Sequence, residues 1–384
     1  MIEDDPLLAD LDAYIVGGAV RDALLGYEPG DRDWVVVGST PEQLIALGFI
    51  PVGADFPVFL HPHTKEEFAL ARTERKTALG YKGFSFYTGQ DVTLEDDLKR
   101  RDLTINAMAR KPYGQLVDPL GGAQDLQARV LKHVGPAFEE DPVRILRLAR
   151  FAARFTDFTI APETIALCRR MVALGEADAL IAERVWQEMS RGLLSKQPSR
   201  FFEILAQCQA LPVVLPGFVW TATCGEQLDE LVASELASLP AMFALAMLQS
   251  QEREALSKRL RAPSDCAQWA KLLPLVTAHC ERDPCLESPE AAADVLRLLN
   301  LADGVRRPER LQVLVAIAYR LLNVPSHNIC QLLAAGAAVK VGEIAKPLQA
   351  AGPKVISAAV NQARQEAIEK CLSRLRADDA DLNA

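Results

Sequence analysis

The sequence predicts an α+β fold, with a mixed sheet and helices in the N-terminal third and an all-α remainder. Strand signals concentrate early, because short segments rich in β-branched and aromatic residues occur at residues 14–16, 34–37, 58–60 and 68–71. Helical segments at 20–25 and 41–47 lie between them, and each ends at a glycine. After about residue 136 the strand signals fade and apolar residues recur at helical spacing.

The helical part is interrupted by segments rich in Pro and Gly. Helical periodicity is clear at residues 142–155, 201–211 and 311–321. The interruptions fall near residues 212–217, 283–289 and 351–353. We therefore expect four parts, a head at 1–135, a neck at 136–210, a body at 211–300 and a tail at 301–384.

Composition excludes several classes of protein. The 384 residues are 49% hydrophobic and 24% charged, which is typical of a soluble globular protein. No apolar run approaches the roughly 20 residues of a membrane span, and the acidic N-terminus lacks a signal-peptide pattern, so we expect a cytoplasmic protein without membrane contact. The eight cysteines form no CxxC pair, which favours reduced thiols over zinc. A net charge of −9 means that RNA contacts must use local basic stripes, such as Arg306, Arg307, Arg310 and Lys340.

A glycine turn between a strand and a helix is the first chemical motif. Residues 14–22 run from an apolar strand through Gly17 and Gly18 into a helix that carries Arg21. Such a turn lets backbone N–H groups approach a phosphate, and the helix N-terminus adds partial positive charge. Arg21 is a surface arginine or a triphosphate contact, and the neighbouring turn favours the phosphate role.

Two aspartates open the second strand. Asp31 and Asp33 are two positions apart, so a strand would place both on one face, roughly 6.5–7 Å apart at Cα. That arrangement suits a pair of hard cations for phosphoryl transfer. An isolated pair of this kind is usually a polar turn, but the glycine turn upstream favours the metal site. Glu67 precedes another strand and is either a third carboxylate of this site or a solvated charge at the strand edge.

A charged run at residues 95–102 leads directly into the apolar segment 103–108. Such runs usually form solvated helix faces. Here the run ends against an apolar segment, which places Arg101 at a boundary and makes it a candidate for contact with a triphosphate or ribose.

The third motif begins the neck. Asp141, Arg144 and Arg147 are spaced by three, close to one helix face, although Asp141-Pro142 alone is also a plain helix start. An acceptor beside donors matches the amino edge of cytosine and of adenine, and it rejects the carbonyl of uracil and guanine. These residues therefore favour a protein that selects a nucleotide without a nucleic-acid template.

Together these motifs resemble those of the class II tRNA nucleotidyltransferases, the bacterial CCA-adding enzymes of the polymerase-β-like superfamily. The matching segments are residues 16–22, 31–34, 100–107, 118–122 and 140–144. Residues 71–76 resemble the gammaproteobacterial branch, and no His-Asp pair follows residue 155, so we expect a member without the HD domain and without phosphohydrolase activity. The resemblance covers about the first 155 residues and is generic beyond residue 210.

The resemblance implies a polymerase-β-like nucleotidyltransferase head followed by the helical neck, body and tail. It implies addition of C, C and A to the tRNA 3′ end from CTP and ATP, with Mg²⁺ and with tRNA bound at its acceptor stem and elbow. In this family pattern Asp31 and Asp33 bind metal, while Gly18, Arg21 and Arg101 contact the nucleotide. The base is read by Asp141, Arg144 and Arg147. The loop at 72–84 resembles the element linked to switching from CTP to ATP.

Three alternatives stay open. Bacterial poly(A) polymerase shares the head, but its expected basic C-terminal extension contrasts with the acidic end of this chain at residues 377–381. A non-catalytic tRNA-binding protein on the same fold would not need the aspartate pair. A small-molecule nucleotidyltransferase would not need some 200 residues of helical sequence. The motif His61-Pro62-His63 suggests metal, but an exposed turn is the preferred interpretation.

Overall fold

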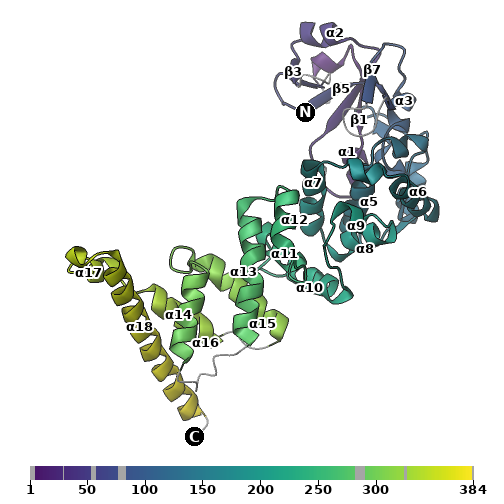
Figure 1. Ribbon diagram of the computed structural model, residues 1–384. Helices are drawn as coiled ribbons and strands as arrows, with labels where there is room; N and C mark the ends of the chain where they lie inside the picture. The colour runs from purple at the N-terminus through teal and green to yellow at the C-terminus, as the bar shows by residue number, and fades with distance from the viewer. Residues whose placement is uncertain are drawn as a thin grey trace. The chain divides into compact units, whose positions relative to one another are not determined.

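A computed structural model describes residues 5–28, 30–52, 58–76, 84–281, 290–323 and 327–382 of the chain. The chain divides into two units, Met1–Pro216 and Gly217–Ala384, and each is considered by itself (Figure 1). The division falls in the segment rich in Pro and Gly at 212–217. The finer boundaries expected between head and neck and between body and tail stay predictions.

The first unit contains a seven-stranded sheet in the order β3-β4-β5-β2-β1-β8-β9. Only β2 and β5 run parallel among the paired neighbours, and the other pairs are antiparallel, so the expected mixed sheet is confirmed. The strands are β1 (Asp12–Val16), β2 (Asp33–Val37), β3 (Ile50–Val52), β4 (Val58–Leu60), β5 (Glu67–Leu70), β8 (Ala109–Arg110) and β9 (Leu116–Val117). Two smaller sheets pair β6 (Thr73–Lys76) with β7 (Phe84–Tyr87) and β10 (Val130–Leu131) with β11 (Thr159–Ile160).

Short helices connect the strands of the head. The α-helices are α1 (Gly18–Leu24), α2 (Pro41–Ala46), α3 (Leu94–Lys99) and α4 (Gly122–Ala128), and the 3₁₀ turns are η2 (Pro6–Leu8), η3 (Thr104–Asn106) and η4 (Pro136–Glu140). The expected ends of the first two helices are confirmed, since Gly26 and Gly48 follow them with φ of 73° and 87°. Thr40 and Thr93 begin α2 and α3 with reciprocal capping boxes.

Apolar side chains cover both faces of the sheet. On one face Val35 of β2 packs in a cluster that includes Leu98 of α3 and Ala107, which follows η3. On the other face Trp34 stacks on Phe68 with 5.1 Å between ring centroids. Burial of both faces explains why β2 is a continuous run of apolar residues after its first position.

The remainder of the first unit is helical apart from β11, as expected. Its elements are α5 (Val143–Arg154), α6 (Pro162–Ala173), η5 (Glu176–Ala179), α7 (Ala182–Leu193), α8 (Ser199–Gln207) and α9 (Leu211–Val214). Helix α5 packs against both α7 and α8, which are labelled in Figure 1. Close approach of α7 to α8 depends on Gly192, because a Cβ there would lie 2.6 Å from the ring of Phe201. This packing fixes the faces of α5 and α7 relative to each other.

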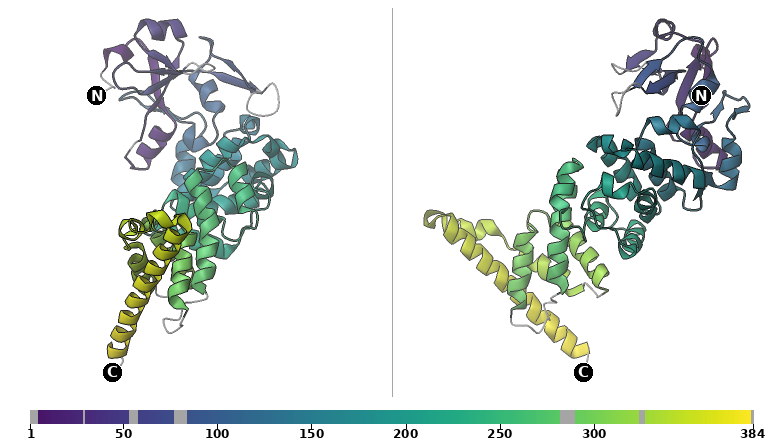
Figure 2. Two further views of the ribbon diagram at one scale, coloured as in Figure 1. Left: turned by 60° about the vertical axis from the view of Figure 1, so that its left-hand side comes forward. Right: turned by 45° about the vertical axis from the view of Figure 1, so that its right-hand side comes forward.

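The described residues of the second unit are all helical or irregular, which confirms the sequence expectation. They form α10 (Ala222–Val232), α11 (Leu239–Ala246), α12 (Arg253–Arg259), α13 (Ser264–Glu281), α14 (Ala291–Leu301), α15 (Pro308–Leu322), α16 (His327–Ala337), α17 (Val341–Ala345), η6 (Gln349–Ala351) and α18 (Pro353–Leu382). Helices α11, α13 and α15 pack in sequence, and the long α18 runs along α14 and α16 (Figures 1 and 2).

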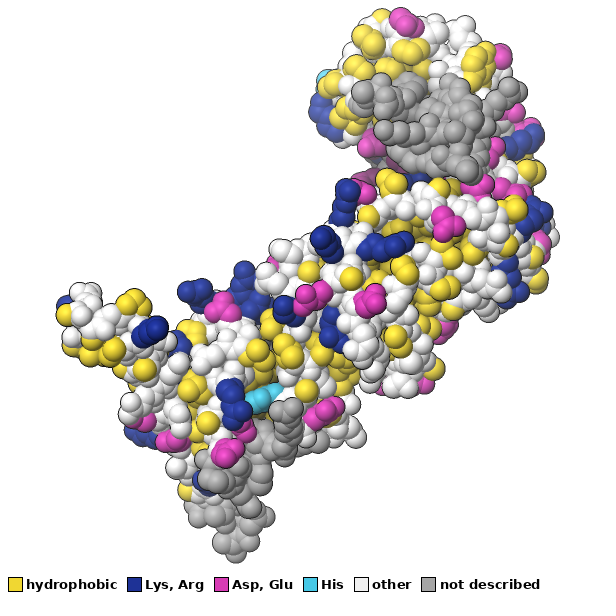
Figure 3. All heavy atoms as spheres, viewed as in Figure 1, with side chains coloured by type: hydrophobic (Ala, Val, Ile, Leu, Met, Phe, Trp, Pro, Cys, Tyr) yellow, Lys and Arg dark blue, Asp and Glu magenta, His cyan; other side chains and the backbone are white. Residues whose placement is uncertain are grey.

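Surface charge and cysteines follow the composition. On the face drawn in Figure 3, Lys and Arg side chains are interspersed with acidic and apolar ones. In the second unit Arg307 contacts Asp265 and Gln268, and Arg310 donates to Gln268. The described cysteines form no disulfide, and Cys285 lies outside the described residues. Among the described helices, none is long and apolar enough to cross a membrane.

The interpretation of residues 61–63 as an exposed turn is wrong in one respect. A turn follows His61, but the His61 side chain itself is fully buried. Its ring packs edge-on against Phe49, and Nδ1 accepts from the backbone N–H groups of His63 and Thr64. The imidazole therefore closes the turn and packs in the core.

Candidate active site

The sheet register brings the expected catalytic residues to one edge. Val16, the last residue of β1, lies opposite Asp33, the first residue of β2. Glu67 begins β5 and is the parallel partner of Asp33. The pairing of β5 with β2, which Glu67 needs in order to act as a third carboxylate of the site, is therefore present. Asp31 lies in the bend before β2 rather than on the strand, because pairing with β1 stops where Gly17 turns away with φ of 69°.

Asp31, Asp33 and Glu67 are exposed and line one cavity of about 920 Å³. Within the described part of the chain, none of the three forms an ion pair. The described residues contain no group of three or more His, Cys, Asp or Glu side chains arranged to hold a metal by themselves. Unpaired carboxylate oxygens fit Mg²⁺, which keeps several waters and takes further ligands from substrate phosphates.

Asp33 is exposed to solvent in the cavity, but the protein atoms around its carboxyl group partly desolvate it, and this raises its pKa above the ordinary value. The charge of Arg101 lowers the pKa, and the negative charges of Glu67 and Asp31 raise it. A bound cation would remove this penalty because it neutralises the like charges.

Glu66 holds the segment that carries the two aspartates. Its Oε1 accepts from Arg32 Nη2 at 2.7 Å, and its Oε2 accepts from Trp34 Nε1 at 2.6 Å. Arg32 and Trp34 alternate with Asp31 and Asp33, so one carboxylate fixes the residue that follows each aspartate. No pattern in the sequence marked Glu66.

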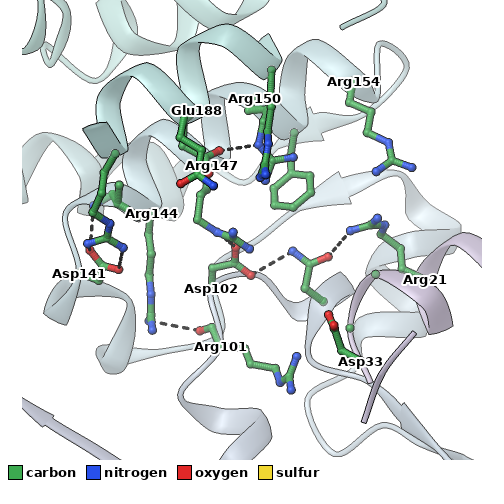
Figure 4. Close-up of a pocket in the computed structure, with 18 of the residues that line it drawn as sticks. Arg21, Asp33, Arg101, Asp102, Asp141, Arg144, Arg147, Arg150, Arg154 and Glu188 are labelled. Carbon is green, nitrogen blue, oxygen red and sulfur yellow. Dashed lines mark hydrogen bonds and ion pairs between the residues drawn. The ribbon is translucent and has the colours of Figure 1, made fainter. Parts of the chain in front are cut away.

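A second pocket, of about 590 Å³, lies between the glycine turn and the helices α5 and α7 (Figure 4). Asp33 lines both this pocket and the carboxylate cavity. Arginines from α1, the segment after α3, α5 and α7 line it: Arg21, Arg100, Arg101, Arg144, Arg147, Arg150, Arg154, Arg184 and Arg191. The carboxylates of Asp33, Asp102, Asp141 and Glu188 also line the pocket, and the excess of guanidinium groups over carboxylates suits a polyphosphate.

The glycine turn and Arg101 are close together. A Cβ on Gly17 would lie 3.0 Å from Arg101 Nη1 and 3.7 Å from the carbonyl of Asn106, and the positive φ favours glycine independently. Arg101 is anchored by Asp97 at 3.1 Å, and its Nε has no hydrogen-bond partner among the described residues. The expected boundary position of Arg101 is confirmed, beside Gly18 and Asp33 in the pocket.

Arg21 is buried rather than on the surface. It is 3% exposed, donates to Asn106 and to Asp22, and lies over the rings of Phe151 and Phe155. The first helix of the head is thereby fixed against α5.

Asp102 links the charged run to the neck. It is 5% exposed and accepts from Arg147 Nε at 2.6 Å and from Asn106 Nδ2 at 3.0 Å. Burial alone would raise the pKa of Asp102, but the Arg147 charge and hydrogen bond, the Asn106 hydrogen bond and the Arg144 charge hold it well below its ordinary value. Arg144 donates to the backbone carbonyls of Arg100, Arg101 and Ala137.

Asp141 meets a residue that the sequence analysis did not select. Its carboxylate forms a two-pronged ion pair with Arg184 of α7, at 2.9 Å and 2.7 Å. Arg150 of α5 and Glu188 of α7 form a second pair between these helices (Figure 4). Arg184 lies in the first turn of α7, and its separation of 43 residues from Asp141 hid the contact in the sequence.

The segment 118–122 is structural in this chain. Asp118 accepts from the N–H groups of Gly122 and Ala123 and begins α4. A Cβ on Gly122 would lie 2.2 Å from the carbonyl of Thr104, so only glycine allows α4 to reach η3. The loop at 72–84 falls largely outside the described residues, Gly80 and Gly83 included.

Comparison with known families agrees with this geometry. The sequence profile of the poly A polymerase head domain matches residues 13–132, and that of the probable RNA and SrmB-binding site of polymerase A matches residues 157–220. The structure is similar to the crystal structure of a Bacillus stearothermophilus CCA-adding enzyme in complex with CTP, with a TM-score of 0.69, 23% identity and coverage of 98% of this chain and 96% of that one. That likeness shows that this chain shares the fold of that structure.

Full-length relatives extend the match over nearly the whole chain. A "CCA-adding enzyme" of Bordetella bronchiseptica is 55% identical over 366 residues, which are 95% of this chain and 98% of the relative. A "Multifunctional CCA protein" of Paraburkholderia phytofirmans is 46% identical, covering 94% of this chain and 100% of the relative. The chain therefore belongs to the family of the CCA-adding enzymes, the class II tRNA nucleotidyltransferases.

Proposed function

We propose that the protein adds C, C and A to the 3′ end of tRNA from CTP and ATP without a template, and that it does so in the cytoplasm with Mg²⁺ at Asp31 and Asp33. The overall activity follows from membership of the family. The observation that carries the residue roles is the position of Asp33, which lines both the carboxylate cavity and the arginine-lined pocket.

The arginine-lined pocket binds the triphosphate in this account. Arg21 and Arg101 face the glycine turn, where the N-terminal amides of α1 add donors for phosphate oxygens. The reaction is attack of the tRNA 3′-hydroxyl on the α-phosphate, with pyrophosphate as the leaving group. Mg²⁺ bound at Asp31 and Asp33 would supply charge neutralisation for the attacking and leaving oxygens. Glu67 stands beside Asp33 as a candidate third carboxylate.

Base selection is assigned to the start of the neck. Asp141 and Arg144 line the pocket that holds the glycine turn and Arg101. A carboxylate acceptor prefers the amino groups of cytosine and adenine over the carbonyls of uracil and guanine. Arg147 contributes to base selection indirectly, because its Nε donates a hydrogen bond to the carboxylate of Asp102.

The test is nucleotide incorporation on a tRNA that ends before its CCA sequence, with product length read on a gel. With CTP alone we expect addition of two nucleotides, and with CTP and ATP an addition of three that then stops. An unlimited A tail would support a poly(A) polymerase instead. Binding of the tRNA without incorporation would support a non-catalytic protein.

A further inference from the structure

We propose that Arg184 is a positioning residue for base selection, which orients Asp141 so that a single oxygen lone pair of its carboxylate faces the incoming base. This inference rests on the proposed function, because it concerns how the same pocket tells CTP and ATP from UTP and GTP. The motif at the start of the neck does not contain Arg184. The residue comes from α7.

Among the described residues, the carboxylate of Asp141 accepts three hydrogen bonds. Oδ1 accepts from the backbone N–H of Val143 at 3.1 Å and from Arg184 Nη1 at 2.9 Å. Oδ2 accepts from Arg184 Nη2 at 2.7 Å. An ionised carboxylate offers about four lone-pair sites, so one site stays open and it lies on Oδ2.

One open acceptor site matches one amino group. Cytosine presents its N4 amino group, and adenine its N6 amino group, beside a ring nitrogen. Uracil and guanine place a carbonyl oxygen in that position, and a carboxylate lone pair repels it. The discrimination depends on the direction of the open lone pair, which the two-pronged contact with Arg184 fixes.

The surroundings of the pair allow a base to reach it. The Asp141 side chain is 19% exposed and the Arg184 side chain 24%, so the pair is neither sealed nor fully solvated. Both residues line the arginine-lined pocket together with Arg144 (Figure 4 shows Asp141 and Arg144). The guanidinium of Arg184 provides a planar fork, which the ammonium of a lysine lacks.

The experiment measures kcat and KM for single additions of CTP and of UTP to a tRNA that ends before its CCA sequence. We compare the parent with Arg184→Gln and Arg184→Lys. Arg184→Gln should lower the CTP-to-UTP ratio of kcat/KM at least tenfold, which corresponds to about 1.4 kcal/mol. The KM for CTP should carry most of the loss, because the base contact exists before the chemical step. Arg184→Lys should give an intermediate ratio, since it keeps the charge and loses the fork.

The matched control is Arg129→Gln, which breaks an exposed ion pair with Asp157, and neither residue lines the arginine-lined pocket. It should leave the ratio at the parent value. A parent-like ratio in Arg184→Gln with a lowered unfolding temperature would overturn the inference, because Arg184 would then only join α5 to α7. A parent-like ratio in Arg184→Lys would also overturn the inference. If Arg184→Gln does not fold, the ratio of Arg184→Lys alone tests the inference.

The proposed function and the role of Arg184 can fail separately. If the parent adds nothing to the tRNA, the proposed function fails and the inference falls with it. If the parent adds CCA while both variants keep the parent selectivity, only the role of Arg184 fails.

Discussion

The acidic edge of the sheet differs from the surface of α5 and α7 that lines the arginine-lined pocket, here called the wall, in whether its carboxylates have ion-pair partners. At the sheet edge, Asp31, Asp33 and Glu67 are exposed, and among the described residues none of them has an ion-pair partner. On the helical wall the carboxylates are paired, with Asp102 on Arg147, Asp141 on Arg184 and Glu188 on Arg150.

This contrast separates two uses of charge. Paired carboxylates are satisfied inside the protein and fix the geometry of the helices around the pocket. Unpaired carboxylates gathered on one edge repel one another, which costs free energy unless a cation binds between them. The sheet edge therefore suits the binding of a cation, whereas the paired carboxylates of the wall suit the positioning of the helices around the pocket.

The largest expected effect comes from removing one unpaired carboxylate. Asp33→Ala should lower nucleotide incorporation by more than about a thousandfold, because a metal supplies several kcal/mol of transition-state stabilisation and each 1.36 kcal/mol is a factor of ten. Affinity for tRNA should stay nearly unchanged. Single-turnover incorporation and filter binding measure the two quantities. Asp10→Ala, an exposed acid of the same unit, is the control, and turnover near the parent rate in Asp33→Ala would exclude the metal assignment.

Removing a paired carboxylate should instead lower stability. Asp102→Asn removes the buried charge that accepts from Arg147 and Asn106, and because the Arg147 side chain is itself 34% exposed, we expect a loss of about 1–3 kcal/mol in the free energy of unfolding. Urea denaturation of the full chain measures this loss. Asp178→Asn, an exposed position between α6 and α7, should change it by less than about 0.5 kcal/mol. A small loss in both variants would contradict the positioning role of the wall.

Asp141 should control selectivity more than stability. Asp141→Ala removes the acceptor for the base amino group, so UTP and GTP should enter and the preference for CTP over UTP should fall by about 10- to 100-fold. Competition between the two nucleotides on one tRNA gives this ratio directly. Glu163→Ala, an exposed acid at the start of α6, serves as the control. Unchanged selectivity in Asp141→Ala would remove Asp141 from base reading.

Glu66 should affect the metal without touching it. Glu66→Gln keeps the shape of the side chain but weakens its hold on Arg32 and Trp34, so the Mg²⁺ concentration for half activity should rise about 10- to 100-fold. The Mg²⁺ dependence of incorporation measures this shift, and Glu42→Gln on the exposed face of α2 is the control. An unchanged Mg²⁺ requirement would mean that the two aspartates are held by other contacts.

The smallest effect concerns pH. Because the pKa of Asp33 is raised, the metal-free folded state binds a proton at Asp33 more tightly than the unfolded state does. Asp33 therefore adds stability to the metal-free protein below the ordinary aspartate pKa, and loses it as the pH rises through the raised value. Lowering the pH should increase the Mg²⁺ concentration for half activity, at most about tenfold per pH unit. A pH-independent requirement would show that Asp33 does not exchange its proton for the metal.

The head was largely predictable because its signals are local. The strands β1 and β2, the glycine turn and the ends of α1 and α2 follow from short patterns around Gly17, Gly26 and Gly48. The two-residue strands β8 and β9 were missed, since their pairing on β1 defines them rather than their own sequence. Asp31 does not belong to β2, because the first paired residue of a strand is set by the hydrogen-bonding register with the neighbouring strand and not by intrinsic strand propensity.

The wall was less predictable because its contacts join distant segments. The spacing of Asp141, Arg144 and Arg147 suggested three side chains that share one task. In the structure Arg144 donates to backbone carbonyls, Arg147 pairs with Asp102, and Asp141 pairs with Arg184. Helical spacing identifies a shared face, but it does not say which partner each side chain meets.

The most direct measurement is anomalous scattering from a crystal of this protein soaked with CTP and Mn²⁺. The account predicts Mn²⁺ between the carboxylates of Asp31 and Asp33, with the triphosphate extending toward Arg21 and Arg101. Manganese bound elsewhere, with triphosphate present and this edge of the sheet free of metal, would contradict the central claim that the unpaired carboxylates are the metal site.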